Sequence, residues 1–152
     1  MSISRSFKST KTNIGVSGSP IPFKATTLPT KGSSLQSDRL LYVKDGNRVN
    51  LSFSYSHTAS GSDGSGVYTI ELPYRPAFEG FYGTGVLFTT TLSGTVPLVL
   101  IASRTNNDLE LRPVGSGGGS GCNFLEDFAA SGAFFDEDIL SLSGSIEYLT
   151  DE

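Results

Sequence analysis

The sequence predicts an all-β protein, an antiparallel β-sandwich of the jelly-roll kind with an extended N-terminal arm. Ser, Thr and Gly make up 55 of the 152 residues, and these residues are poor in helix interiors. Several short segments alternate apolar and polar residues with a period of two, as half-buried strands do. Turn sequences separate about seven such segments at spacings of 8–16 residues, which is typical of sandwiches. The length fits one domain.

Residues 1–37 are predicted to form the extended basic arm. This range shows no helical or strand period and carries three prolines among Ser, Thr and Lys. It also contains isolated apolar residues, in which a purely disordered tail is usually poorer. We therefore expect the arm to become ordered on a partner surface, and the remaining domain to stay folded without it.

Residues 38–152 are predicted to form the β-sandwich domain, with an acidic C-terminal segment, and they open with a hairpin. Residues 40–43 and 48–57 are strand-like, and Lys44-Asp45-Gly46-Asn47 between them is a turn sequence. In the second strand, apolar residues at odd positions alternate with polar residues at even ones. They are Val49, Leu51, Phe53 and Tyr55 against Asn50, Ser52, Ser54 and Ser56.

The later strands follow in order, separated by loops rich in Ser, Gly or Asn. Residues 67–72 alternate and stop at Pro73, which cannot donate to a ladder. Residues 97–102 form a continuous apolar run, typical of a fully covered strand. The other predicted strands are residues 86–92, 109–112 and 139–149. Residues 58–66 and 115–121 are predicted loops, and residues 123–138 are expected to hold a helical turn.

The charge is divided between the two ends of the chain. Residues 1–37 carry five basic residues and no acid, whereas residues 122–152 carry eight acids and no base. One interpretation is an arm that meets an acidic protein surface or the acidic end of a neighbouring copy. The other is a solvated tail and a solvated face. No nucleic-acid partner is expected, because the spread basic residues lack interleaved aromatics.

The side chains available for catalysis are few, so we expect no enzyme and no catalytic residue. His57 is expected to be a packed or rim residue, since no G-x-S-x-G elbow accompanies it. Cys122 is expected to be a small inert hydrophobe. Nothing in the sequence places Glu71 and Asp108 across a cleft as a carboxylate pair.

No cofactor, metal or membrane is expected either. The acids at 136–138 lack the spacing of a calcium loop and are better explained as a solvated turn. The loop at 115–121 lacks the Gly-Lys ending of a phosphate loop. No apolar run reaches 18 residues, and no apolar segment follows the basic start of the chain.

One predicted loop, residues 74–83, is rich in aromatic residues. The possible contact residues are Tyr74, Arg75, Phe78, Phe81 and Tyr82. Such groups stack on sugar rings or pack against an apolar protein surface. The alternative is that they close one end of the sandwich or line an oligomer axis.

Residues 40–149 resemble β-sandwich domains of tailed-bacteriophage virion proteins. The resemblance depends on Tyr42, Gly46, the alternating strand from Val49 to Tyr55, and Leu72-Pro73. Such domains recur in capsid decoration proteins, in head fibres and at tail-fibre tips, and they are commonly trimeric. The resemblance implies a homotrimer and brings no catalytic residue with it.

Among these roles, the resemblance favours a capsid decoration (cement) protein, which binds the major capsid protein and stabilises the capsid exterior of the virion. Decoration proteins are short chains with an extended arm, whereas a fibre tip follows a trimerising shaft that this sequence lacks. The expected capsid-binding arm residues are Arg5, Phe7, Lys8, Lys11, Ile21, Phe23, Lys24 and Lys31. The alternative is a receptor- or glycan-binding tip of a tail fibre or head fibre, which would bind a host-surface glycan through the aromatic loop.

Overall fold

The computed structural model describes residues 13–17, 21–30, 32, 37–58, 67–89, 94–114 and 139–152. In these ranges every regular element is a strand, so the all-β prediction is confirmed. The strands are β1 (Asn13–Ser17), β2 (Phe23–Lys24), β3 (Asp38–Asp45), β4 (Arg48–Thr58), β5 (Thr69–Glu71), β6 (Phe81–Thr89), β7 (Gly94–Ser103), β8 (Asp108–Pro113) and β9 (Ile139–Leu149).

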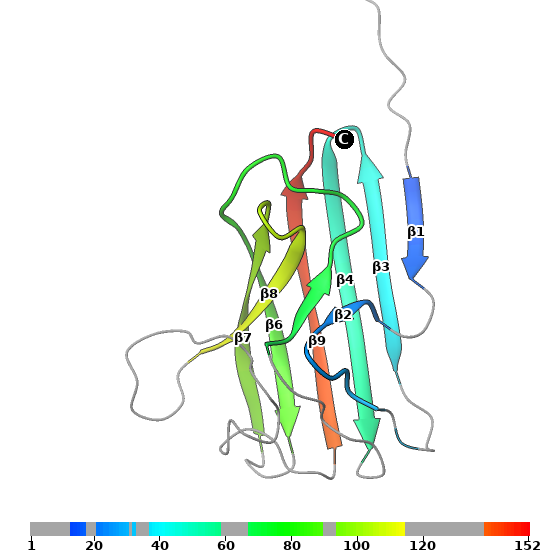
Figure 1. Cartoon of the computed structure of the whole chain (residues 1–152), viewed down its shortest axis with the longest axis vertical. Coiled ribbons are helices and arrows are strands. Elements are labelled where there is room, and N and C mark those ends of the chain that lie inside the picture. The colour runs from blue at the N-terminus through cyan, green and yellow to red at the C-terminus, as the bar shows by residue number, and fades with distance from the viewer. Residues whose placement is uncertain are drawn as a thin grey trace, which may run out of the picture.

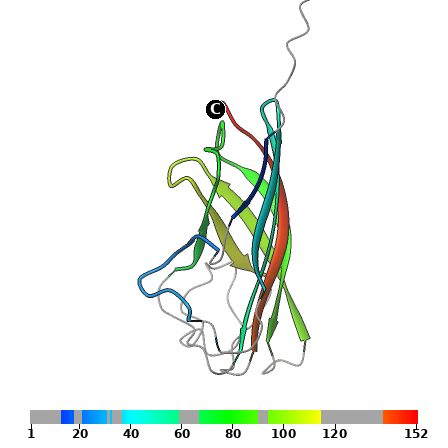
Figure 2. The same cartoon turned by 90° about the vertical axis from the view of Figure 1, so that its right-hand side faces the viewer.

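All nine strands belong to one sheet, in the order β1-β3-β4-β9-β6-β7-β8-β5-β2. Every neighbouring pair is antiparallel, as predicted. The sheet curls, so that β8, β5 and β2 lie in front of β9 and β4 (Figures 1 and 2). The curl brings Phe23 of β2 against Tyr55 of β4, with ring centroids 5.0 Å apart. The described strands therefore form one curled, half-barrel sheet instead of the two separate sheets expected for a sandwich.

The predicted hairpin is present as β3 and β4. Asp45 pairs with Arg48 across the turn, and Gly46 adopts a φ of 60° there. A left-handed conformation of this kind suits glycine, which has no Cβ to clash with the backbone. The odd positions of β4 that are described are buried and the even ones are not, as the alternation predicts.

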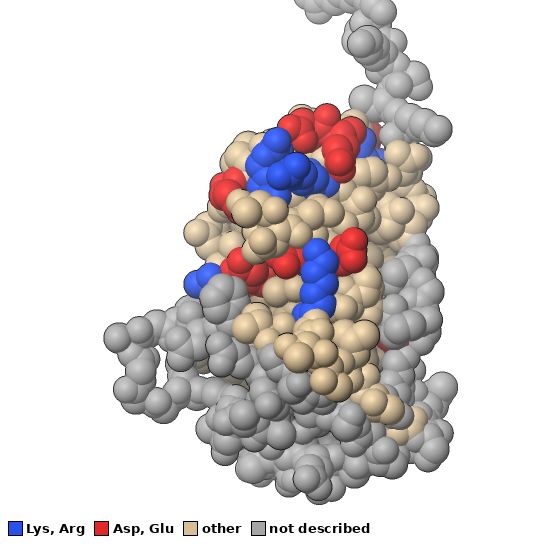
Figure 3. Space-filling view, in the orientation of Figure 1, with Lys and Arg blue, Asp and Glu red and all other residues tan. Residues whose placement is uncertain are grey.

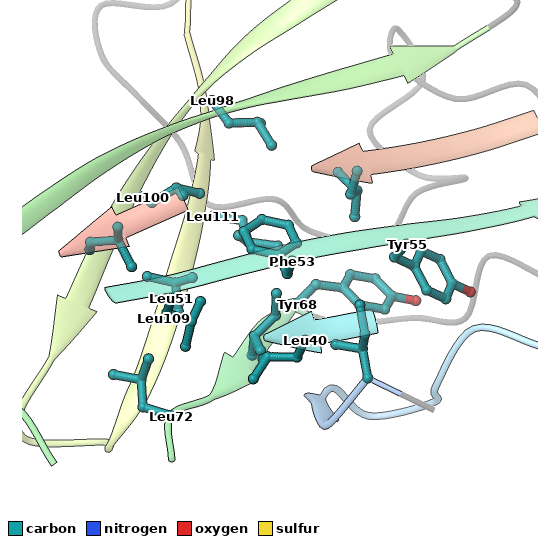
Figure 4. Close-up of a cluster of buried hydrophobic side chains, with 14 of the residues drawn as sticks. Leu40, Leu51, Phe53, Tyr55, Tyr68, Leu72, Leu98, Leu100, Leu109 and Leu111 are labelled. Carbon is teal, nitrogen blue, oxygen red and sulfur yellow. The ribbon is translucent and has the colours of Figure 1, made fainter. Parts of the chain in front are cut away.

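The core lies inside the curl, between the concave face of the larger strands and β8, β5 and β2 (Figure 4). Its largest fully buried side chains include three tyrosines, Tyr55, Tyr68 and Tyr148. The Tyr148 hydroxyl donates to the carbonyl oxygen of Tyr74 at 2.9 Å, and that of Tyr68 donates to Thr27 at 3.3 Å. These bonds satisfy polar groups that would otherwise be costly to bury.

The structure corrects the prediction that residues 97–102 form a fully covered strand. In β7, Leu98, Leu100 and Ala102 are buried, but Pro97 is exposed and Val99 is only half-buried. The reason is that the curled sheet covers only its concave face. The apolar residues on the other side of β7 therefore have no layer above them in the described part of the chain.

Glycines mark the place where β6 and β9 run closest together. Gly85 is paired directly with Gly144. A Cβ on Gly144 would lie 2.9 Å from both the Leu100 side chain and the Thr84 carbonyl oxygen, and one on Gly85 would lie 2.6 Å from the Ser143 carbonyl oxygen. Backbone atoms cannot yield to such contacts, so the tight pairing of these strands requires glycine.

Both edges of the sheet are formed by strands from the predicted arm. β1 pairs with β3 at one edge, and β2 pairs with β5 at the other. Ile21 and Phe23 are buried in the core. The expected boundary at residue 37 thus does not separate the sheet from the chain before it, and residues 1–12 of the predicted arm lie outside the described residues.

Candidate interaction face

The convex side of the sheet presents a broad face that no described element covers. It consists of the outward side chains of β1, β3, β4, β9, β6 and β7, the opposite positions to those in the core. Six of the ten large hydrophobic side chains that are exposed among the described residues lie on this face. They are Ile14, Leu41, Val43, Tyr82, Val86 and Phe88.

The exposed apolar side chains form two ridges. The first ridge consists of Ile14 on β1 with Leu41 and Val43 on β3, and the second consists of Tyr82, Val86 and Phe88 on β6. Their exposure is high for residues of this kind. Ile14 is 76% exposed, Tyr82 67% and Phe88 40%. Clustered exposure of this kind marks interaction surfaces.

Between the ridges, β4 and β9 form a trough with small polar side chains. Ser52 pairs with Ser145, and Ser54 with Ser143. Ser145 in turn pairs with Thr84 of β6. An open groove of about 600 Å³ lies here. Its outward-facing lining includes Leu41, Val43, Asn50, Ser52, Tyr82, Thr84, Ser145 and Glu147.

Charged groups on this face stand at its ends. Arg48 and Glu147 form an ion pair at 3.5 Å, with more than half of each side chain exposed, so solvent leaves the pair little net strength. Arg39 and Asp45 occupy outward positions at the two ends of β3. A neutral centre with charges at the margin is the composition of protein interfaces.

The residues of the predicted aromatic loop do not form one surface. Phe81 and Tyr82 belong to β6, where alternation points Phe81 toward the core and Tyr82 outward. The ring centroid of Phe81 lies 4.4 Å from that of Phe78 and 6.4 Å from that of Tyr148. The ring centroids of Tyr74 and Tyr42 are 5.7 Å apart. Two of the four rings, Tyr74 and Phe81, therefore pack against the core, while Phe78 is exposed beside Phe81 and Tyr82 alone among the five residues lies on the candidate face.

Arg75, the remaining predicted contact residue, belongs to a polar network near the C-terminus of the chain. Its Nε donates to the carbonyl oxygen of Arg104, and its backbone N–H donates to the Glu152 carboxylate at 2.8 Å. The acidic and basic side chains gathered there are visible at the top of Figure 3. This network fastens the chain end to the segment that follows β5.

Glu79 occupies the centre of the same network. Its carboxylate accepts hydrogen bonds from the Thr105 hydroxyl and from the backbone N–H groups of Arg104 and Thr105, at 2.7–2.9 Å. These bonds favour the ionised form and lower the pKa of Glu79. The Arg104 guanidinium also reaches Asp151 at 3.2 Å. The arrangement holds the loops at this end of the sheet in place.

Three of the expected capsid-binding residues, Ile21, Phe23 and Lys24, make contacts within the fold. Ile21 and Phe23 are core residues, so they cannot also lie on a shell surface while this fold is intact. Lys24 donates from Nζ to the carbonyl oxygen of Asn106 at 3.0 Å. The others lie outside the described residues. They are Arg5, Phe7, Lys8, Lys11 and Lys31.

Glu71 and Asp108 turn out to be neighbours, as paired residues on β5 and β8. Asp108 is buried, and burial raises its pKa, although a hydrogen bond with Thr69 opposes the shift. Neither residue lines the groove on the convex face. The side chain of His57, and all of Cys122 and of 136–138, lie outside the described part.

Neither a metal-binding group of side chains nor a membrane-spanning helix occurs in the ranges that the structure describes. No three His, Cys, Asp or Glu side chains there stand close enough to hold a metal ion. The described residues also include no helix long and apolar enough to cross a membrane.

Comparisons with known proteins show no family for this chain. The chain matches no protein-family model, no curated protein and no solved structure. The candidate face is therefore described from the residues of this chain, without a related protein for comparison.

Sequence reasoning missed Leu41, Val43, Val86 and Phe88 as an exposed set, although a signal was present. Residues 40–43 and 86–88 are apolar at consecutive positions. In an antiparallel sheet, consecutive apolar residues point to both faces. Such a run therefore indicates a strand that is covered on both faces, or a strand with apolar side chains exposed on one face.

Proposed function

We propose that this protein is a non-enzymatic structural protein of a virus particle, a decoration protein on the outer surface of a tailed-phage head. The observation that carries the structural role is the uncovered face with two apolar ridges and a neutral centre. Such a face serves association with macromolecules. The choice of a phage head derives from the resemblance, whose residues Tyr42 and Gly46 lie in the β3–β4 hairpin.

In this proposal, the chain is related to jelly-roll sandwiches and acts as a homotrimer bound to the major capsid protein. The curl supports the relation to a sandwich, because β2 packs over β4 as a strand of a second layer would. Attachment is assigned to residues 1–12, which precede β1 and carry Arg5, Phe7, Lys8 and Lys11. Ile21 and Phe23 are left out of the contact set because they are core residues.

A second candidate is the receptor- or glycan-binding tip of a head or tail fibre. The observation that favours it is the exposed ring of Tyr82, which borders the groove together with Asn50 and Ser145. An aromatic ring beside amide and hydroxyl groups suits a sugar, which presents both an apolar face and hydroxyls.

The test is co-sedimentation of the full chain with a panel of undecorated tailed-phage capsids, and separately with host cells, at low and high salt. We expect capsid binding that weakens with salt and is lost when Arg5, Lys8 and Lys11 are changed to Ser, since screening acts on exposed charges. The matched control is R48S, which removes an exposed arginine within the sheet. Binding to cells but to no capsid would transfer the function to the second candidate.

A further inference from the structure

The convex face carries two complementary shapes side by side. The β6 ridge, with Tyr82, Val86 and Phe88, projects beside the trough formed by β4 and β9. β3 and β6 are three strand spacings apart in the sheet order, or about 14 Å. The trough is therefore about two strands wide and is open enough to receive a row of side chains.

Charge also favours a partner of the same kind. The described charged residues at outward positions of β3, β4, β9 and β6 are Arg39, Arg48, Asp45 and Glu147, two basic and two acidic, so the face has no net charge. The whole chain has a formal charge of −4. Two copies that meet through this face bring together surfaces without net charge, so the contact itself carries little like-charge repulsion.

We propose that a second copy of this chain covers the face, with the β6 ridge of one copy seated in the β4–β9 trough of the next. This inference rests on the proposed structural function and names the partner of its face. Burial of the exposed ridge supplies the driving force. The hydroxyl of Tyr82 then meets Ser52 and Ser145, whose own hydroxyls rotate to donate or accept.

The contact joins unlike parts of the face, ridge against trough. Contacts of this kind close either as a reciprocal pair or as a ring, and the trimer implied by the resemblance is such a ring. The basic and acidic side chains of the face are equal in number, so a strongly basic or acidic partner gains little from it.

The test uses the full chain in sedimentation velocity between about 1 and 100 μM, a range that covers micromolar association. We expect the wild type to self-associate. Y82D places a charge on the ridge and S52R fills the trough, so each variant alone should associate at least about tenfold more weakly. L28D changes an exposed leucine outside the face and should associate like the wild type.

Mixing Y82D with S52R gives the sharpest result. Y82D keeps its trough and S52R keeps its ridge, so the mixture can form one unaltered contact and should yield a mixed dimer. A wild type that stays monomeric at 100 μM, unimpaired single variants, or a mixture without the dimer would each overturn the inference. Circular dichroism verifies that both variants keep the β fold.

The test separates this inference from the proposed function. Capsid binding by a chain that does not self-associate would refute the pairing of copies and the homotrimer, and would leave the capsid role standing. Self-association without capsid binding would refute only the capsid role. A monomer that binds an oligosaccharide on a glycan array, with binding lost in Y82D, would assign the face to sugars and overturn the inference.

Discussion

The two sides of the same strands have very different surroundings. On the concave side, alternate residues of β4, β6 and β9 are buried under β8, β5 and β2. On the convex side, the intervening residues face solvent, yet several are as apolar as those in the core. In β3 and β6, therefore, hydrophobicity along the strand does not show which side another layer covers, whereas the alternation in β4 does.

Strand β6 illustrates the difference within neighbouring positions. Leu87 is fully buried and Phe88 is 40% exposed. Phe81 packs against Tyr148 while Tyr82 faces outward. The inward residues stabilise this chain, and the outward ones are available to stabilise an assembly.

The largest expected effect comes from removal of residues 1–37, which supply both edge strands and two core side chains. Loss of Ile21 and Phe23 alone should cost roughly 5–10 kcal/mol, comparable with the whole stability of a small domain. We expect this truncation to be unfolded by circular dichroism, contrary to the sequence-based expectation. Removal of residues 1–12 should leave the unfolding midpoint almost unchanged, and an equal effect of both truncations would refute this account.

The two sides of β6 are compared directly by L87A and F88A. The first leaves a cavity in the core and should lower the free energy of unfolding by about 2–5 kcal/mol. The second removes a half-exposed ring and should cost less than about 1 kcal/mol in the monomer. Urea unfolding at low protein concentration measures both. Similar losses would mean that the convex side is also covered within one chain.

Strand spacing at the glycine pair is tested by G144A, with S143A as the control on the convex side. A methyl group at residue 144 would meet the Leu100 side chain and the Thr84 carbonyl oxygen, so we expect a loss of about 1–3 kcal/mol. S143A should stay within about 0.5 kcal/mol of the wild type. Thermal unfolding distinguishes the two, and a harmless G144A would show that the strands can separate freely.

The smallest effect concerns the network that closes the end of the concave face. Because the pKa of Glu79 is lowered in the folded state, its ionised form stabilises the protein above the ordinary glutamate pKa, and this contribution is lost as pH falls through the lowered value. Glu79 is solvent-exposed, so screening limits the cost of E79Q to under about 1 kcal/mol at neutral pH. The difference between variant and wild type should vanish in acid. A difference independent of pH would exclude the charge as its cause.

Only part of the candidate face was readable from the sequence, namely its serines and Tyr82. The serines of β4 and β9 were predicted on the polar sides of their strands, and the structure places them outward. Tyr82 was singled out, but together with Tyr74 and Phe81, which the fold uses for packing. Adjacent residues of one strand point to opposite faces, so a dense aromatic segment divides once it becomes a strand.

The strands from β3 to β9 follow in outline from the sequence, because a period of two and turn residues such as Gly46 are local properties of the chain. Strands β1 and β2 do not, because they lie in a range without a strand period. The fold alone shows that Ile21 and Phe23 complete the core and that the pairing of Gly85 with Gly144 leaves no room for a Cβ. It also shows which side of β3 and of β6 is covered, because these strands carry apolar residues on both sides. The physical reason is that burial depends on segments far apart in sequence, since β2 pairs with β5 and packs on β4. No local pattern records those contacts.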